Sequence, residues 1–199
     1  SDHSRGLLEV LGRYNVDSVL LGLEDTRGAM YPQWRSMMDG EDAVEILAQA
    51  GQQVIIEPDV KLQVLNPPEQ SAGGLVHDPN NDGVVLKLTY GEFSFLLTAD
   101  IESPAENQLV RSGPALNSRV LKVAHHGSRT STTPAFLASV EPSVGVISVG
   151  TTNSFGHPVP EVLERLEEAM GEGAILRTDR DETIEFTSDG QGLWFKTER

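Results

Sequence analysis

The sequence predicts a mixed α/β fold in which buried strands carry reactive side chains to loops at their carboxyl ends. Three short apolar runs have the length and composition of buried strands: 95–99, 120–124 and 143–149. An Asp or a His follows each run, namely Asp100, then His125 and His126, and then His157. Amphipathic helical patterns at 103–112 and 159–170 alternate with these strands. In α/β folds the sheet is the scaffold, and the loops at the strand ends carry the chemistry.

The first fifty residues predict three helices and one strand. Apolar residues spaced by three and four positions from Leu7 onward predict an amphipathic helix. Residues 18–22 have the pattern of a short buried strand, and a short helix with an apolar side is expected around Trp34. Residues 41–50 predict a further helix, because two acids occupy its first turn and Gly51 stands at its end.

Four strands are expected in the middle of the chain: 53–57, 60–65, 84–90 and 93–99. The last two form a hairpin across Gly91. The turn-rich stretch 66–83 predicts a loop, and we interpret its His77 as a surface residue. Ser103 is expected to cap the helix at 103–112, with Pro104 in the first turn. The tail predicts a strand and a terminal hairpin: 174–177, 183–187 and 192–196.

Composition limits the chemistry that the chain can perform. Its 199 residues predict a single domain over 1–199, and no apolar run approaches the ~20 residues that span a bilayer. Cysteine is absent, which excludes disulfides, thiol nucleophiles and Cys-ligated zinc, so a metal here must use His and carboxylate ligands. The net charge of −15 argues against a broad nucleic-acid-binding face, but it is compatible with a site that binds a divalent cation.

The histidines indicate a metal site. Four of the five stand at predicted element ends beside Gly or Asp: His3, His125, His126 and His157. A strand would point the adjacent pair in opposite directions, so that one imidazole faces a site and the other makes supporting hydrogen bonds. Asp100, taken alone, is better explained by a helix cap than by a metal ligand. The combination favours a site built from His and Asp ligands.

Three stretches together resemble a known family. They are LLTADIE at 96–102, LKVAHHGS at 121–128 and VISVGTTNSFGHP at 146–158, and an amphipathic helix follows. Their order and spacing resemble metallo-β-lactamase-fold proteins, and more narrowly the C-terminal domain of the ComEC competence family, which forms the inner-membrane DNA-uptake channel. The resemblance covers the whole chain. It implies an αββα sandwich, whose first strands we expect to precede Ser1.

The resemblance also implies roles for individual residues. The family carries an HxDxDH motif, of which Asp2 and His3 would be the last part. The metal ligands implied by the family pattern are Asp2, His3, Asp100, His125 and His157. The implied catalytic residues are Asp2, Asp100 and His126, with Asp100 bridging two metals. His125 and His126 both line the site, and the pattern does not separate their roles.

Two departures from the family pattern bear on metal binding. Residues 80–83 hold no His where many lactamase-fold enzymes have one, and Ala99 replaces the usual Gly before Asp100. The family uses two Zn or Mn ions. We expect this stretch of chain by itself to bind metal weakly or not at all, and to be inactive.

The resemblance implies a phosphodiesterase or nuclease that degrades the DNA strand that is not imported. Ser128 and Arg129 are candidates to hold a phosphate, although a polar loop before the helix from Pro134 explains them equally well. The implied partners are DNA and the transmembrane channel region of the same polypeptide. The implied location is a soluble domain on the extracytoplasmic side of the cell membrane.

Two other interpretations stay open. The first is a non-catalytic docking module beside the channel, which the acidic composition favours slightly. The second is a stand-alone metallohydrolase acting on a small phosphodiester or ester.

A sheet that lacks its first strands would also expose an edge, so we expect self-association through that edge.

Overall fold

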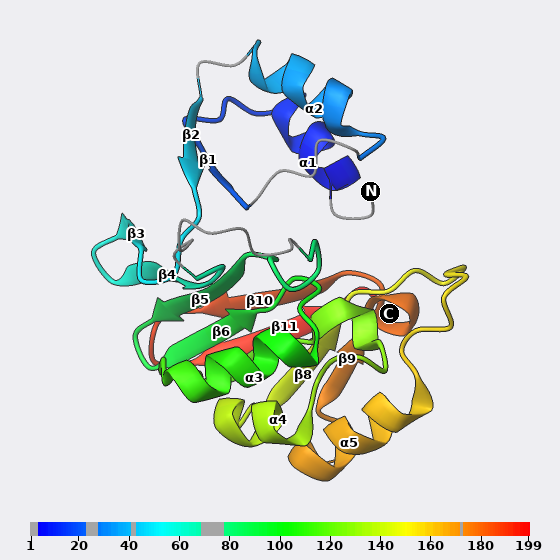
Figure 1. The fold of residues 1–199 in the computed structure, drawn as a ribbon. Coiled ribbons are helices and arrows are strands. Elements are labelled where there is room, and N and C mark those ends of the chain that lie inside the picture. The colour runs from blue at the N-terminus through cyan, green and yellow to red at the C-terminus, as the bar shows by residue number, and fades with distance from the viewer. Residues whose placement is uncertain (1–3, 23–27, 41–42, 69–77, 172) are drawn as a thin grey trace. The chain divides into compact units, whose positions relative to one another are not determined.

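The computed structural model describes residues 4–22, 28–40, 43–68, 78–171 and 173–199 (Figure 1). The chain forms two compact units, Ser1–Ala48 and Gln49–Arg199. Because Asp2, His3 and His77 lie outside the described residues, their expected roles stay predictions.

The first unit contains two helices and two short strands: α1 Ser4–Leu11, β1 Ser18–Leu21, α2 Tyr31–Met38 and β2 Val44–Leu47. The strands pair in parallel, with Ser18 opposite Val44. Helices α1 and α2 pack together, and Leu8 and Met38 are buried. Arg35 of α2 forms an ion pair with Glu45 of β2 at 2.9 Å. The helix near Leu7, the strand at 18–22 and the helix around Trp34 are therefore confirmed.

The helix predicted at 41–50 is wrong, because this stretch forms the strand β2. Its apolar residues include the β-branched Val44 and Ile46, which suit an extended chain. Backbone pairing with β1 then outweighs the local helix signals, which are a weak guide when tertiary contacts compete with them. Gly51 adopts a φ of +94° in the turn before the next strand and does not end a helix.

A seven-stranded sheet organises the second unit. In chain order its strands are β3 Gln53–Glu57, β4 Val60–Asn66, β5 Val85–Tyr90, β6 Phe93–Leu97, β7 Val120–Lys122, β8 Val144–Ile147 and β9 Ile175–Arg177. The spatial order equals the chain order. Strands β3 to β6 pair antiparallel, whereas β6 to β9 pair in parallel. The carboxyl ends of the parallel strands therefore lie along one edge of the sheet.

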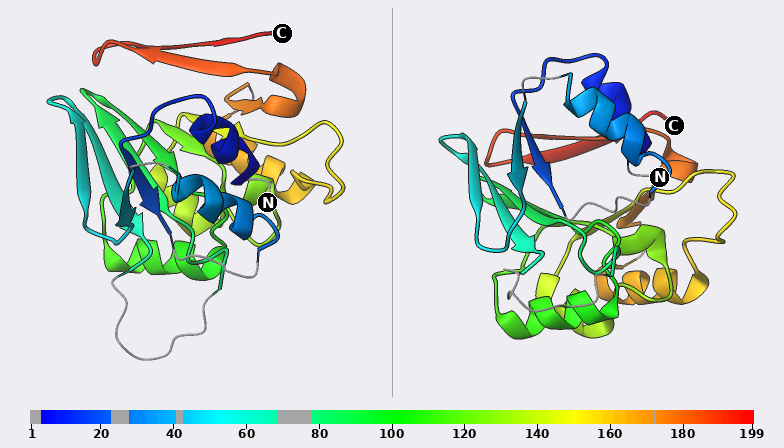
Figure 2. Two further views of the ribbon diagram at one scale, coloured as in Figure 1. Left: turned by 90° about the horizontal axis from the view of Figure 1, so that it is seen from above. Right: turned by 45° about the horizontal axis from the view of Figure 1, so that its top comes forward.

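Three helices cover one face of this sheet: α3 Ser103–Ser112, α4 Pro134–Val140 and α5 Pro160–Met170 (Figures 1 and 2). Leu96, Leu121 and Ile147 from three neighbouring strands are fully buried in the core cluster. Helix α5 contributes Val162 and Leu166 to the same core. This burial fixes the parallel strands and thus the positions of their carboxyl ends.

The chain ends in a hairpin of β10 Ile184–Ser188 and β11 Leu193–Thr197, after the short helix α6 Thr178–Asp181. The Phe186 ring meets the Phe95 ring of β6 edge-on, with centroids 5.4 Å apart. The backbone N–H of Glu92 donates to the Gly190 carbonyl at 3.0 Å, so the hairpin turn is tied to the β5–β6 turn. The predicted terminal hairpin and the predicted mixed α/β class are both confirmed.

Helix α3 begins differently from the expectation. Glu102 occupies the N-cap position, and Ser103 is the first helical residue. The side chain of Asn81 supplies the cap, because its Oδ1 accepts from the backbone N–H groups of Glu102 and Ala105 at 3.1 and 3.2 Å. This arrangement also removes Asp100 from consideration as the cap.

None of the helices in the described ranges is long and apolar enough to cross a membrane.

Candidate metal centre

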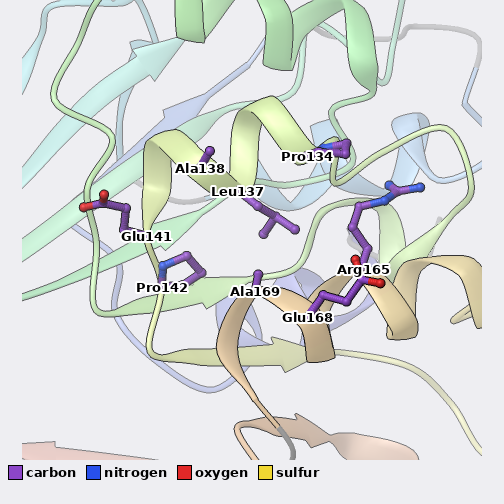
Figure 3. A pocket seen from close by; sticks show the side chains of 8 residues that line it. All are labelled: Pro134, Leu137, Ala138, Glu141, Pro142, Arg165, Glu168 and Ala169. Atoms are coloured by element: carbon purple, nitrogen blue, oxygen red, sulfur yellow. The ribbon is translucent and has the colours of Figure 1, made fainter.

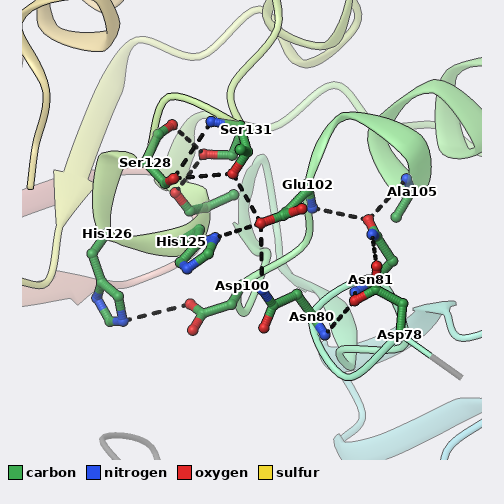
Figure 4. Close-up of polar contacts among 12 residues, drawn as sticks. Asp78, Asn80, Asn81, Asp100, Glu102, Ala105, His125, His126, Ser128 and Ser131 are labelled. Carbon is green, nitrogen blue, oxygen red and sulfur yellow. Dashed lines mark hydrogen bonds and ion pairs between the residues drawn. The ribbon is translucent and has the colours of Figure 1, made fainter. Parts of the chain in front are cut away.

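Asp100 and three histidines gather where the parallel strands end. Asp100 follows β6, and His125 with His126 follows β7 (Figure 4). His157 lies in the segment between β8 and α5, with its ring centroid 5.7 Å from that of His125. The predicted convergence of these strand-end residues is therefore present in the fold.

The adjacent histidines stand in a tight left-handed turn. Strand β7 ends at Lys122, two residues earlier than expected, and Ala124–Gly127 forms one turn of 3₁₀ type. The φ values are 48° for His125, 54° for His126 and 80° for Gly127. The left-handed region costs a non-glycine residue roughly 1–2 kcal/mol. Such strain is found at functional sites, where the surroundings hold it in place.

His126 faces Asp100. Its Nδ1 lies 2.6 Å from the Ser148 carbonyl oxygen, which can only accept, so Nδ1 carries the proton. In the neutral ring Nε2 is then an acceptor, and it lies 3.6 Å from Oδ1 of Asp100. Both side chains are largely buried. Two ligands of a tetrahedral zinc ion stand about 3.4 Å apart, so this spacing suits a shared cation.

His125 faces a different carboxylate. Its Nδ1 lies 3.2 Å from Oε1 of Glu102, and the same oxygen accepts from the Thr130 hydroxyl at 2.9 Å and the Asn80 amide at 3.3 Å (Figure 4). The contact of His125 Nδ1 with Glu102 is at ion-pair distance and is not a hydrogen bond. No motif in the sequence pointed to Glu102 or Asn80 as a site residue. The available signal was that Glu102 follows Asp100 by two residues in LLTADIE.

His157 is held in its neutral form. Burial is the main cause that lowers the pKa of His157, and the neighbouring His125 and His126 lower it further. Asp100 acts in the opposite direction. Asn153 fixes the backbone at His157, because its amide donates to the His157 carbonyl at 3.0 Å and its Oδ1 accepts from the His157 N–H at 3.1 Å. A neutral imidazole is the form that binds a metal.

The donor types fit Zn or Mn, which accept His nitrogen and carboxylate oxygen. Within the described ranges, no group of three or more such side chains is close enough to hold an ion. What these ranges supply is the Asp100–His126 pair, with His157 in the same cluster of rings. The structure thus answers which histidine faces Asp100, and the ligand and catalytic assignments of the sequence analysis stay predictions.

The turn is supported from outside by α3 and α5. Glu106 of α3 is fully buried and accepts from the backbone N–H groups of Thr132 and Thr133. Arg165 of α5 donates to the carbonyls of Ser131 and Thr132, at 3.1 and 2.6 Å. The Ser131 hydroxyl in turn lies 2.9 Å from the Ala124 carbonyl oxygen. Burial raises the pKa of the Glu106 carboxyl, and the two backbone donors oppose that rise.

A surface groove between α4 and α5 borders Arg165 (Figure 3). Its lining comes from these two helices and the residues next to α4: Pro134, Leu137, Ala138, Glu141, Pro142, Arg165, Glu168 and Ala169. Asp100, His125, His126 and His157 do not line it. The groove is thus a feature of the supporting helices.

The two candidate phosphate-binding residues are engaged within the protein. The Ser128 hydroxyl lies 3.0 Å from the Thr130 hydroxyl and is mostly buried. Arg129 forms an exposed ion pair with Glu161 of α5 at 2.9 Å. Thr133 caps α4 by accepting from the Phe136 N–H at 3.3 Å. The expected capped loop is present, and a phosphate-binding role for Ser128 and Arg129 stays a prediction.

The family of this chain is shown by a match to a known protein family over most of its length. The model of the metallo-beta-lactamase superfamily matches residues 1–151. The chain belongs to the metallo-beta-lactamase superfamily. The strand-end Asp100 and the His125–His126 turn lie inside the matched region, whereas His157 lies beyond it.

Three curated bacterial proteins are similar to this chain over part of its length. The chain is 34% identical over 128 residues to ComE operon protein 3 of Bacillus subtilis, which covers 64% of this chain and 16% of that protein. It is 37% identical over 110 residues to competence protein ComA of Neisseria gonorrhoeae, covering 55% and 16%. It is 39% identical over 87 residues to recombination protein 2 of Haemophilus influenzae, covering 44% and 11%. The chain thus spans a small part of each relative.

Among solved structures, the chain resembles a candidate metal-dependent hydrolase from Parabacteroides distasonis. The TM-score is 0.42 and the sequence identity 10%, over 84% of this chain and 77% of that one.

Substitution of Gly127 tests how closely the His125–His126 turn packs against the segment that carries His157. A Cβ on Gly127 would lie 2.6 Å from Cβ of Pro158, and the Gly127 carbonyl accepts from Val159 at 3.0 Å. Gly113 has a similar φ of +73°, but a Cβ there meets nothing within 4 Å. In urea unfolding we expect Gly113→Ala to cost about 1 kcal/mol from φ alone, and Gly127→Ala to cost at least about 1 kcal/mol more. Equal losses would contradict the close approach.

The pKa of His157 tests the electrostatics of the cluster. In metal-free protein followed by NMR, we expect it below the ordinary 6.5. His125→Gln should raise it, because a repelling neighbour is removed, and Asp100→Asn should lower it further. Because the folded-state pKa is depressed, His157 contributes stability above its ordinary pKa, and this contribution is lost as pH falls through the folded value. A lower pKa of His157 in His125→Gln, or a higher one in Asp100→Asn, would refute this arrangement.

Proposed function

We propose that this domain is a metal-dependent hydrolase of phosphodiesters and that its substrate is DNA. The observation that carries the proposal is the opposition of His126 Nε2 and Asp100 Oδ1 at 3.6 Å, with His157 kept neutral nearby. This pair lies on the loops at the carboxyl ends of parallel strands, where α/β folds place their active sites.

The residues of the candidate metal centre have separate roles in this proposal. Asp100 and His126 would be metal ligands, and His157 lies in the same cluster of rings. A bound Zn or Mn ion would make water nucleophilic at neutral pH and stabilise the leaving oxygen. Ser148 fixes the tautomer and direction of the His126 ring through its carbonyl. Glu102 faces His125, which lines the site beside His157.

The biological setting follows from the relatives. One is named for the ComE operon, one for competence and one for recombination. Because this chain spans only 11–16% of their lengths, the setting of the whole protein is part of the proposal. We propose that the domain works beside the membrane channel region of the same polypeptide, on the extracytoplasmic side, and degrades the DNA strand that is not imported. Self-association through an exposed sheet edge belongs to the same proposal.

A second candidate is a docking module without catalysis. The net charge of −15 supports it, because an acidic surface repels a polyanion at long range. The two candidates differ in what Asp100 and His126 do. In an enzyme these side chains control turnover, and in a docking module they affect only the fold.

The test is hydrolysis of end-labelled single- and double-stranded DNA in the presence of Mn or Zn. We expect cleavage by the full-length wild-type protein, and a rate at least about 100-fold lower for its Asp100→Asn and His126→Ala variants. Asp59→Asn is the matched control, because Asp59 is an exposed aspartate on the β3–β4 turn, and its rate should equal that of the wild type. Folding of every variant is checked by urea unfolding.

Cleavage at the wild-type rate by both site variants would contradict the proposal and indicate a contaminating nuclease. A wild-type protein that is folded and loaded with metal, yet cuts neither DNA nor a small phosphodiester, would favour the docking module.

A further inference from the structure

Phe155 is an exposed aromatic side chain beside the candidate metal centre. It is 77% exposed, more than any other large apolar side chain in the described part of the protein. It stands two residues before His157 and is not part of the buried core cluster. Leaving a phenyl ring in water forgoes the hydrophobic stabilisation that burial would give. The fold therefore presents this ring without using it for its own core.

The loop that carries Phe155 is anchored at both ends. Next to β8, the Val149 N–H donates to the Thr178 hydroxyl at 2.8 Å. At the far end, the Val159 N–H donates to the Gly127 carbonyl of the histidine turn at 3.0 Å. Between them, the Asn153 amide contacts the carbonyls of Gly150 and His157. Figures 1 and 2 show the segment between β8 and α5 extending outward from the second unit.

Phe155 is the outer member of a row of rings that leads to the metal centre. Its ring lies over that of His157, with centroids 6.0 Å apart and planes inclined by 25°. His157 lies 5.7 Å from His125, which lies 6.4 Å from His126. One face of the Phe155 ring is taken by His157, so a planar ligand on the outer face would extend the row by one ring. This position suits the nucleotide that flanks the phosphate to be cut.

We propose that Phe155 is a substrate contact that stacks on one base of single-stranded DNA. This inference rests on the proposed function and extends it to the way in which the strand is held. A phenyl ring has no hydrogen-bonding groups, so the contact would accept every base and confer no sequence preference. The net charge of −15 gives stacking added importance, because ionic attraction to the phosphates is weak on such a protein.

The test separates the base from the phosphate backbone. Binding is measured by fluorescence anisotropy in EDTA, so that no cleavage occurs, with a labelled dodecamer of thymidine and an abasic dodecamer of equal charge. Phe155→Ala should bind the thymidine strand about tenfold or more weakly than the wild type, because one stacked base is lost. It should bind the abasic strand as the wild type does. Phe155→Trp should retain the affinity, and its fluorescence should be quenched by the thymidine strand and not by the abasic one.

Trp194→Ala is the matched control, because Trp194 is an aromatic residue of β11 with 55% exposure. It should bind both strands as the wild type does. A wild-type protein that binds DNA while Phe155→Ala binds the thymidine strand equally well would overturn the inference and leave the proposed function intact. A wild-type protein that neither binds nor cuts DNA would overturn both. A loss of affinity by Phe155→Ala that is equal for the two strands would also overturn the inference.

Discussion

The candidate site depends on the hydrogen bonds that hold one left-handed turn. His125, His126 and Gly127 are three consecutive residues with positive φ, and Ala99, whose carbonyl accepts from the His125 N–H at 3.2 Å, has a φ of 47°. The three non-glycine residues, Ala99, His125 and His126, each cost about 1–2 kcal/mol in this conformation, and thus several kcal/mol together. The surrounding protein must offset that cost, or the turn would relax and the imidazoles would move.

Buried polar groups on two helices provide this support. Glu106 holds two backbone N–H groups and Arg165 holds two carbonyls of the same short loop, which in turn holds the histidine turn through Ser131. A hydrogen bond contributes about 0.5–1.5 kcal/mol, so the four contacts together match the strain in scale. These hydrogen bonds hold the turn in which the two adjacent histidines face different carboxylates: His126 faces Asp100, and His125 faces Glu102. One strand end thereby supplies both a candidate ligand and an oriented neighbour.

Much of the second unit could be predicted from the sequence, because its strands and helices have strong local patterns. The strand before Asp100 and the helix after His157 follow from apolar periodicity. The proximity of Asp100 and His157 follows from the parallel order of the strands that precede them. The left-handed turn could not be predicted, because His rarely adopts positive φ and only Gly127 hinted at it. The contact of Glu102 with His125 joins residues 23 positions apart, so no local pattern reports it. The helix expected at 41–50 failed for a similar reason, because its pairing with β1 is not local.

We propose that Asp100 and His126 share one metal ion. The most direct measurement is a crystal structure of the protein soaked with Mn or Zn, with the ion located by anomalous scattering. The account predicts a peak about 2.0–2.2 Å from both Oδ1 of Asp100 and Nε2 of His126. A peak between His125 and Glu102, or a loaded protein with no ion near Asp100, would contradict it.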